Sequence, residues 1–167
     1  NFARTVVLLL AHSEDGAFGI VLNRPRADVP IADHLPLWSE HVASPAVFFA
    51  GGPVEPEAAI GLARRGAQSP PAEGWSEAWD GIGTINLEVS PSTLIEALAD
   101  VRLFTGYAGW GPGQLEQELE SEAWFTVAAE PADAFSTDPS ELWRSVLRRQ
   151  PHPLAMFAYF PQSPRIN

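Results

Sequence analysis

The segment from Thr105 to Leu119 reads Thr-Gly-Tyr-Ala-Gly-Trp-Gly-Pro-Gly-Gln-Leu-Glu-Gln-Glu-Leu and constrains the fold more than any other part of the chain. Glycine and proline this close together end regular structure and favour a tight turn. The apolar residues before the turn predict a strand, and the two leucines after it predict a helix anchored to the core. We therefore expect a strand–turn–helix unit with Tyr107 and Trp110 packed over the turn.

A phosphate-binding loop also connects a strand to a helix, but this turn differs from one. The glycine spacing does not match G-x-G-x-x-G, and Pro112 lacks a backbone N–H that a phosphate would use. We expect the glycines to serve the backbone, through positive φ or close approach; they are Gly106, Gly109, Gly111 and Gly113. The glutamates that follow are expected to be mostly a solvated surface, with an acidic contact patch for a basic partner protein as the alternative; they are Glu116, Glu118, Glu120 and Glu122.

Apolar runs separated by turn residues predict the rest of the sheet. The runs 5–11 and 17–22, joined through Asp15-Gly16, predict a hairpin, and their continuous apolarity predicts strands covered on both faces. Further strands are predicted at 46–50, 58–63, 84–89 and 101–108, although residues 55–57 could equally begin a helix, and a surface loop is predicted at 66–76. Hairpins interspersed with helices favour an α+β fold in one domain over a regular parallel sheet.

Capping signals predict short helices between the strands. Residues 30–35 form one, with Asp28 as a candidate cap, and Ser90-Pro91 begins another. The last helix begins at Asp138-Pro139, where Glu141 completes a capping-box pattern. Its predicted buried stripe is Leu142, Trp143, Val146 and Leu147.

The composition excludes several kinds of chemistry. The 167 residues contain no cysteine, which excludes disulfides, thiolate nucleophiles and cysteine-based metal sites within them. All ten basic residues are arginine, so Schiff-base lysines and phosphate-binding lysines are also excluded. Neither a G-x-S-x-G elbow nor an H-x-x-x-H pair occurs, and we predict no catalytic residue, no cofactor and no metal site. No apolar run approaches the roughly 20 residues that span a bilayer, so we expect a cytoplasmic protein without a membrane partner.

The net charge of −11 at pH 7 limits the choice of partners. DNA binding depends on a dense cationic surface that displaces counterions from phosphates. The arginines of this chain are scattered, and the surface would on average repel DNA. Direct DNA binding is therefore not expected.

Several motifs of this chain occur together in one known family. They are the opening strand 1–12, Gly19-Ile-Val-Leu-Asn-Arg-Pro25, Gly51-Gly-Pro-Val54, Gly106-Tyr-Ala-Gly-Trp110, Trp124 and Glu141-Leu-Trp-Arg144. With them the chain resembles the AlgH/YqgE family of small bacterial proteins, whose biochemical activity is not established. The resemblance implies one domain over 1–167, with a mixed sheet curled into an irregular partial barrel and flanking helices. It also implies an association with transcriptional regulation and a segment before Asn1 that the family usually carries.

One polar site is predicted where three strand-end motifs could converge. Asn23 and Arg24 offer an amide and a guanidinium that could bind a carboxylate or phosphate. The candidate ligand-binding residues are Asn23, Arg24, Gly51, Gly52, Thr105, Gly106 and Tyr107. The structural alternative is that Asn23 completes a turn, Arg24 pairs inside the protein, and the glycines only turn the chain.

Two functions are consistent with these observations. The preferred one is a non-enzymatic binding or regulatory protein that acts through a protein partner or a small anionic ligand. The alternative is an enzyme or small-molecule-binding protein that uses the strand-end pocket. The two differ in geometry, because the second requires the three motifs to line one concave site.

Overall fold

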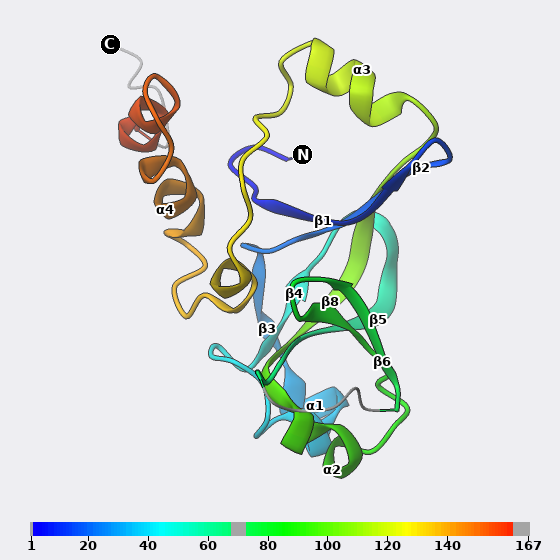
Figure 1. Ribbon diagram of the computed structural model, residues 1–167. Helices are drawn as coiled ribbons and strands as arrows, with labels where there is room; N and C mark the ends of the chain where they lie inside the picture. The colour runs from blue at the N-terminus through cyan, green and yellow to red at the C-terminus, as the bar shows by residue number, and fades with distance from the viewer. Residues whose placement is uncertain (1, 68–72, 162–167) are drawn as a thin grey trace.

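The computed structural model describes residues 2–67 and 73–161, which form an eight-stranded mixed sheet with short helices around it (Figure 1). The strands are β1 (Val7–Ser13), β2 (Gly16–Val21), β3 (Pro25–Pro30), β4 (Val47–Ala50), β5 (Val54–Arg65), β6 (Trp75–Trp79), β7 (Ile82–Ile85) and β8 (Leu98–Trp110). The α-helices are α1 (Ile31–His34), α2 (Pro91–Leu94), α3 (Gln114–Glu120) and α4 (Leu142–Arg148). Short 3₁₀ helices are η1 (Pro36–Trp38), η2 (Ile95–Ala97), η3 (Pro131–Phe135) and η4 (Leu154–Tyr159). Across these two ranges, no helix is long and apolar enough to cross a membrane.

The long strand β8 organises the sheet. It pairs antiparallel with β5 and, through residues 108–110, with β2, while β4 runs parallel beside Phe104 and Thr105. The order β1-β2-β8-β5-β7-β6 makes β1 and β6 the two ends of this path. The sheet is curled (Figure 1), and its two ends contact each other. The predicted α+β fold, with one domain and a mixed sheet curled into a partial barrel, is confirmed.

Two hydrophobic clusters cover the two faces of the curled sheet. Neighbouring residues divide between them, because successive side chains of a strand point to opposite faces. Phe104 and Leu62 belong to the first cluster, and their neighbours Leu103 and Ala63 belong to the second. All four are fully buried, so the centre of the sheet is covered on both sides.

The prediction that both strands of the first hairpin are covered on both faces is wrong for β1. The hairpin itself is confirmed, since β1 and β2 pair antiparallel. In β2, Ile20 and Val21 are buried, but in β1 only Leu8 is, and Leu9 is 38% exposed. Because β1 lies at the end of the sheet, its apolar run extends beyond the surface that the core covers.

The predicted strand 84–89 is displaced toward the N-terminus. β7 ends at Ile85, yet Leu87 and Val89 still pack on the second cluster. The alternating pattern thus identified the packed face but not the hydrogen-bonded ladder. Strand β6, which pairs with β7, begins inside the predicted loop 66–76, of which 68–72 lie outside the described residues.

The predicted caps are only partly formed. Asp28 lies within β3 and does not cap α1, so that prediction is wrong. The Asp138 Oδ1 atom accepts a hydrogen bond from the Glu141 backbone N–H at 3.3 Å. The Glu141 carboxylate instead pairs with Arg144 at 2.7 Å and Arg148 at 3.1 Å. Only the Asp138 half of the predicted box is present, and it lies before the helix, since α4 begins at Leu142 with Glu141 as its N-cap and without a side-chain cap.

Candidate functional site

Two adjoining cavities follow strand β1. The first, of about 510 Å³, lies between the segment 2–7, α4 and residues 123–127. The second, of about 430 Å³, lies between β1, α3 and residues 124–129. Both are lined by Val7, Trp124, Phe125 and Val127. We call the two cavities together the β1 groove, and residues 124–129 the strap.

The strap runs from α3 past the start of β1 to η3 without pairing with the sheet (Figure 1, yellow). Within the described part of the chain, its backbone makes no hydrogen bond to other backbone groups. Side chains hold it instead: Val127 packs on the first cluster beside Leu8 and Trp79. Side-chain contacts alone leave gaps between an extended segment and a strand, and the groove consists of such gaps.

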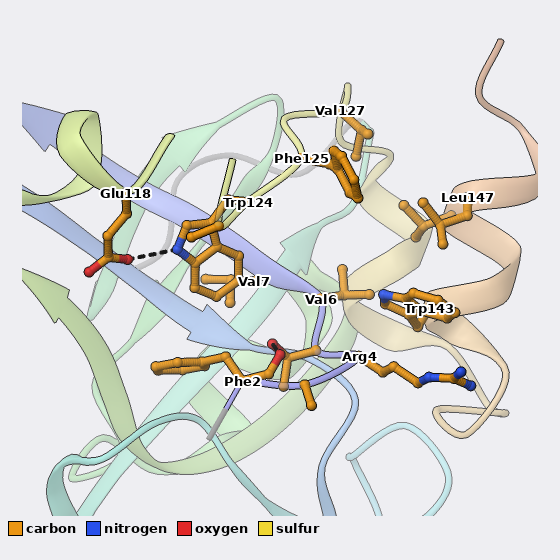
Figure 2. Close-up of a pocket in the computed structure, with 14 residues that line it drawn as sticks. Phe2, Arg4, Val6, Val7, Glu118, Trp124, Phe125, Val127, Trp143 and Leu147 are labelled. Atoms are coloured by element: carbon orange, nitrogen blue, oxygen red, sulfur yellow. Dashed lines mark hydrogen bonds between the residues drawn. The ribbon is translucent and has the colours of Figure 1, made fainter. Parts of the chain in front are cut away.

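A carboxylate holds two tryptophans at the end of the groove near α3. The Glu118 carboxylate accepts a hydrogen bond from the indole N–H of Trp124 at 2.7 Å (Figure 2). It also accepts hydrogen bonds from the indole N–H of Trp110 and from Gln114 Nε2, both at 3.0 Å. The Trp124 bond, followed by the Trp110 bond, lowers the pKa of Glu118. Trp124 also contacts the ring of Phe2, with centroids 5.3 Å apart. Glu118 therefore links α3, the end of β8 and the strap.

The other end of the groove is formed by Arg4 and Trp143 (Figure 2). The Arg4 guanidinium lies 4.9 Å from the Trp143 ring centroid and donates hydrogen bonds to the carbonyl oxygens of Phe160 and Pro161. Leu147 completes this wall from the buried stripe of α4. Trp143 itself is only half-buried, contrary to the prediction, because its ring borders the cavity rather than the core.

The lining of the groove is mainly apolar and aromatic, with its charges at the two ends. Such a lining suits an apolar body oriented by a few polar contacts. In residues 2–67 and 73–161, no three His, Asp or Glu side chains group to hold a metal ion.

Five of the seven predicted site residues come together at the end of β4 and the bend of β8. Ala50 lies opposite Thr105, and the Gly51 N–H donates to the Thr105 carbonyl at 2.8 Å. A Cβ on Gly52 would lie 2.1 Å from the Tyr107 carbonyl carbon, and one on Gly106 would lie 2.5 Å from the Gly52 oxygen. Backbone therefore packs directly on backbone at this strand-end cluster.

The expectation that all four glycines of the signature turn serve special backbone conformations holds only in part. Gly106 and Gly113 have positive φ, of 69° and 71°. Gly109 and Gly111 do not, and a Cβ on either would meet no atom closer than 3.4 Å. The turn needs glycine at two of the four positions.

Asn23 and Arg24 lie beside the segment that leads into β1. The Asn23 side chain accepts from the Val6 N–H and donates to the Arg4 carbonyl, both at 2.9 Å. Arg24 is exposed and donates to the Ala3 carbonyl at 3.1 Å. None of the seven predicted residues lines the β1 groove, and a strand-end pocket stays a prediction.

Sequence reasoning missed the residues that shape the groove. Glu118 was grouped with the solvated glutamates, although its spacing from Trp110 and Trp124 could have indicated a shared contact. Arg102 lies in β8 and is only 1% exposed, but no pattern in the apolar sequence around it predicts that its side chain is buried. It donates to the carbonyl oxygens of Ser44, Ala134 and Ser136, and burial lowers its pKa to about 10. These bonds attach η3, which follows the strap, to the sheet.

Comparison with known proteins places the chain in a family. A family model described as AlgH-like matches residues 1–155. A UPF0301 protein of Streptomyces avermitilis is 48% identical over 170 residues, covering 100% of this chain and 88% of the relative. A crystal structure of a Corynebacterium diphtheriae protein has a TM-score of 0.88 at 34% identity, over 96% of this chain and 84% of that one. The solution structure of the AlgH protein from Pseudomonas aeruginosa has a TM-score of 0.67 at 28% identity, over 98% and 87% of the two chains. The chain belongs to the AlgH-like family.

Proposed function

We propose that this protein is a non-enzymatic binding protein whose binding site is the β1 groove. The observation that carries the proposal is the groove itself, two adjoining cavities of about 510 and 430 Å³ with an aromatic lining. Volumes of roughly 300–1,000 Å³ and apolar linings with few polar groups are typical of ligand sites.

The strap supports a binding role because it can adapt at low cost. Its backbone makes no hydrogen bond to other backbone groups within the described residues, so a small movement of the strap breaks no ladder. Its attachment to α3 through Glu118 and to the sheet through η3 keeps both ends in place. A segment fixed at both ends and loose between them is suited to close over a bound group.

Any regulatory effect would pass through the bound partner rather than through DNA. The net charge of −11 opposes contact with a polyanion. A cytoplasmic protein that holds a partner molecule or a small ligand in the groove is therefore the role that we propose.

The first test measures whether the groove accepts an apolar molecule. N-phenyl-1-naphthylamine is a neutral probe whose emission rises in apolar surroundings, and the acidic protein does not repel it. Ala123 lines the first cavity and Ala129 the second, whereas exposed Ala128 lines neither. We expect Ala123→Trp and Ala129→Trp to reduce the probe signal, and Ala128→Trp to leave it near that of the unaltered protein.

A second test uses the same variants as baits in an extract of the source cells. A partner that depends on the groove should be retained by the unaltered protein and by Ala128→Trp, but not by Ala129→Trp. Equal probe binding by all variants would place the site elsewhere. Turnover of a metabolite by purified protein, lost in the blocked variants, would show that the role is enzymatic.

A further inference from the structure

Strand β1 directs part of its backbone into the groove. The Leu22 N–H donates to the Val6 carbonyl at 2.8 Å, and Leu8 lies opposite Ile20 in the same antiparallel ladder. In such a ladder, alternate residues direct their N–H and C=O groups toward the partner strand. The register is regular from Val7 to Leu9 and shifts only after Leu9. Up to that point, Val6 and Leu8 therefore direct their backbone N–H and C=O groups toward β2, while Val7 and Leu9 direct these groups to the outer edge.

These outward groups border the second cavity. Val7, Leu8 and Leu9 all line it, although successive side chains of a strand point to opposite faces. A cavity that touches three successive residues lies beside the strand rather than over one face. Across the cavity lie the strap and Trp79 of β6, a strand that contacts β1 without pairing with it. Within the described chain, β1 pairs with no strand other than β2.

We propose that the β1 groove binds an extended, basic segment of a partner protein, which adds to β1 as a further strand. This inference rests on the proposed function and names the chemistry of the occupant. Addition of a strand to an exposed edge derives affinity from main-chain hydrogen bonds and specificity from side-chain pockets. Val7 and Leu9 supply the hydrogen-bonding groups, and apolar side chains at alternate positions of the partner enter the cavities.

The charges around the second cavity favour a basic occupant. Both β1 and α3 line this cavity, and exposed acidic side chains lie on the turn of the β1–β2 hairpin, on α3 and just after it. We call these side chains the acidic rim: Glu14, Asp15, Glu116, Glu120 and Glu122. The His12 side chain also lines this cavity, and its Nε2 atom is hydrogen-bonded to the Glu116 carboxylate. The arginine that borders the groove, Arg4, lies at the opposite end and is held by Trp143 and the Phe160 carbonyl. Lysine or arginine between the apolar residues of the segment would complement this rim.

The same charges disfavour a second copy of this chain as the occupant. Pairing of two β1 edges would bring two such acidic rims together, each on a chain with a net charge of −11. Like charges placed opposite each other across an interface oppose association. The charges thus oppose pairing between two copies of this edge, whereas they attract a basic strand.

The test uses a fluorescein-labelled peptide, Val-Lys-Val-Lys-Val-Lys-Val with a C-terminal amide, titrated with protein and followed by anisotropy. Two N-methylated versions carry the methyl groups on alternate amides, one set on the valines and the other on the lysines. In a bound strand only one of these sets faces β1. We expect one version to lose about tenfold or more in affinity and the other to lose little.

A matched pair of protein variants probes the same contact from the other side. Leu9→Pro removes the outward N–H without removing a bond to β2, as proline is tolerated on the free side of an edge strand. Leu9→Ala keeps the N–H and removes most of the side chain. We expect about a tenfold loss in affinity for the proline variant and ~threefold or less for the alanine variant. Since Leu9→Pro could impair folding, the two N-methylated peptides on the unaltered protein give an independent answer.

Each outcome bears on the proposal. Equal binding of both N-methylated peptides and their parent would overturn strand addition. Equal binding of a peptide with glutamate in place of lysine would overturn the basic partner. Dimerisation lost in Leu9→Pro, without peptide binding, would identify a second copy as the occupant. If the naphthylamine probe binds but no peptide does, the groove still serves as a binding site and only this inference fails.

Discussion

The strand-end cluster and the β1 groove are parts of one sheet, but the chain segments meet differently in them. At the cluster, Gly52 and Gly106 let backbone touch backbone, and no space remains for a Cβ. Along the groove, the strap approaches β1 through aromatic and apolar side chains and makes no backbone bond to the sheet within the described residues. Contacts between glycine-containing backbones close completely, whereas rigid rings spanning a wider gap leave cavities.

This difference separates stability from binding. A closed backbone contact has no room to adjust, so a single added methyl group must move a strand. A contact made by side chains can open locally at small cost, as binding requires. We therefore expect substitutions at the cluster to destabilise the fold strongly, and substitutions at the groove to have graded effects.

The largest effect is expected for Gly106→Ala. Its φ of 69° disfavours any residue with a Cβ, and the new atom would lie 2.5 Å from the Gly52 oxygen. Strain and overpacking together should reduce the free energy of unfolding by about 3 kcal/mol, measured by urea denaturation. A loss below about 1 kcal/mol would show that the cluster is as adaptable as the groove.

A smaller effect is expected for Trp143→Ala in the wall of the groove. Removal of a fully buried tryptophan costs roughly 3–5 kcal/mol, but this ring is half-buried and borders a cavity. We expect a loss of about 2 kcal/mol in urea denaturation. Tyr159→Ala, at a position 77% exposed, is the control and should be nearly neutral. Equal losses at the two positions would contradict the assigned wall.

Glu118→Gln tests the link between α3 and the strap. Two indole N–H groups would lose a charged acceptor, and because the site is partly exposed we expect a cost of about 1 kcal/mol. The pKa of Glu118 is lowered from 4.5 in the folded protein, so its contribution is complete above that value and is lost as the pH falls through the lowered pKa. The difference in stability between the unaltered protein and Glu118→Gln should therefore shrink in acid. Glu120→Gln, on the exposed side of α3, should show neither effect.

The smallest effect is expected for Gly111→Ala. Its φ is not positive, and the nearest atom to an added Cβ is Gln114 Oε1, at 4.0 Å. The substitution should be neutral or stabilising by up to about 1 kcal/mol, because alanine restricts the unfolded chain. Thermal melts of Gly111→Ala and Gly106→Ala side by side provide the comparison. Strong destabilisation by both substitutions would mean that backbone packs directly on backbone throughout the turn and not only at Gly106.

Much of the fold could be predicted from local patterns. The Asp15-Gly16 turn predicted the first hairpin. The apolar residues before the glycine-rich turn predicted β8, and Leu115 and Leu119 after it predicted α3. Strand β6 escaped prediction because its sequence, Trp-Ser-Glu-Ala-Trp, lacks a continuous apolar face. It is a strand because β7 offers an edge to pair with, a tertiary cause that no local pattern contains.

The candidate groove could not be predicted in the same way. Its lining residues lie within 2–12, at 79 and 110, and within 115–129 and 143–147, and they meet only when the sheet curls and α4 folds back over the N-terminal segment. Trp124 could be identified in the sequence as part of a family motif. The hydrogen bond from its indole N–H to Glu118 could not, because it depends on where α3 ends. The hydrogen bonds of Arg102 are even less predictable from local sequence, because its three carbonyl partners lie 32 to 58 residues away along the chain.

The sequence by itself determined the family, the α+β class, the central strand–turn–helix unit and the acidic character of the surface. These properties depend on backbone preferences and composition, which act over a few residues or over the whole chain at once. Only the tertiary structure decided which glycines are indispensable, which edge of the sheet stays unpaired and where the cavities lie. Those properties depend on how closely distant segments approach, and that distance is set by the packing of all the side chains between them.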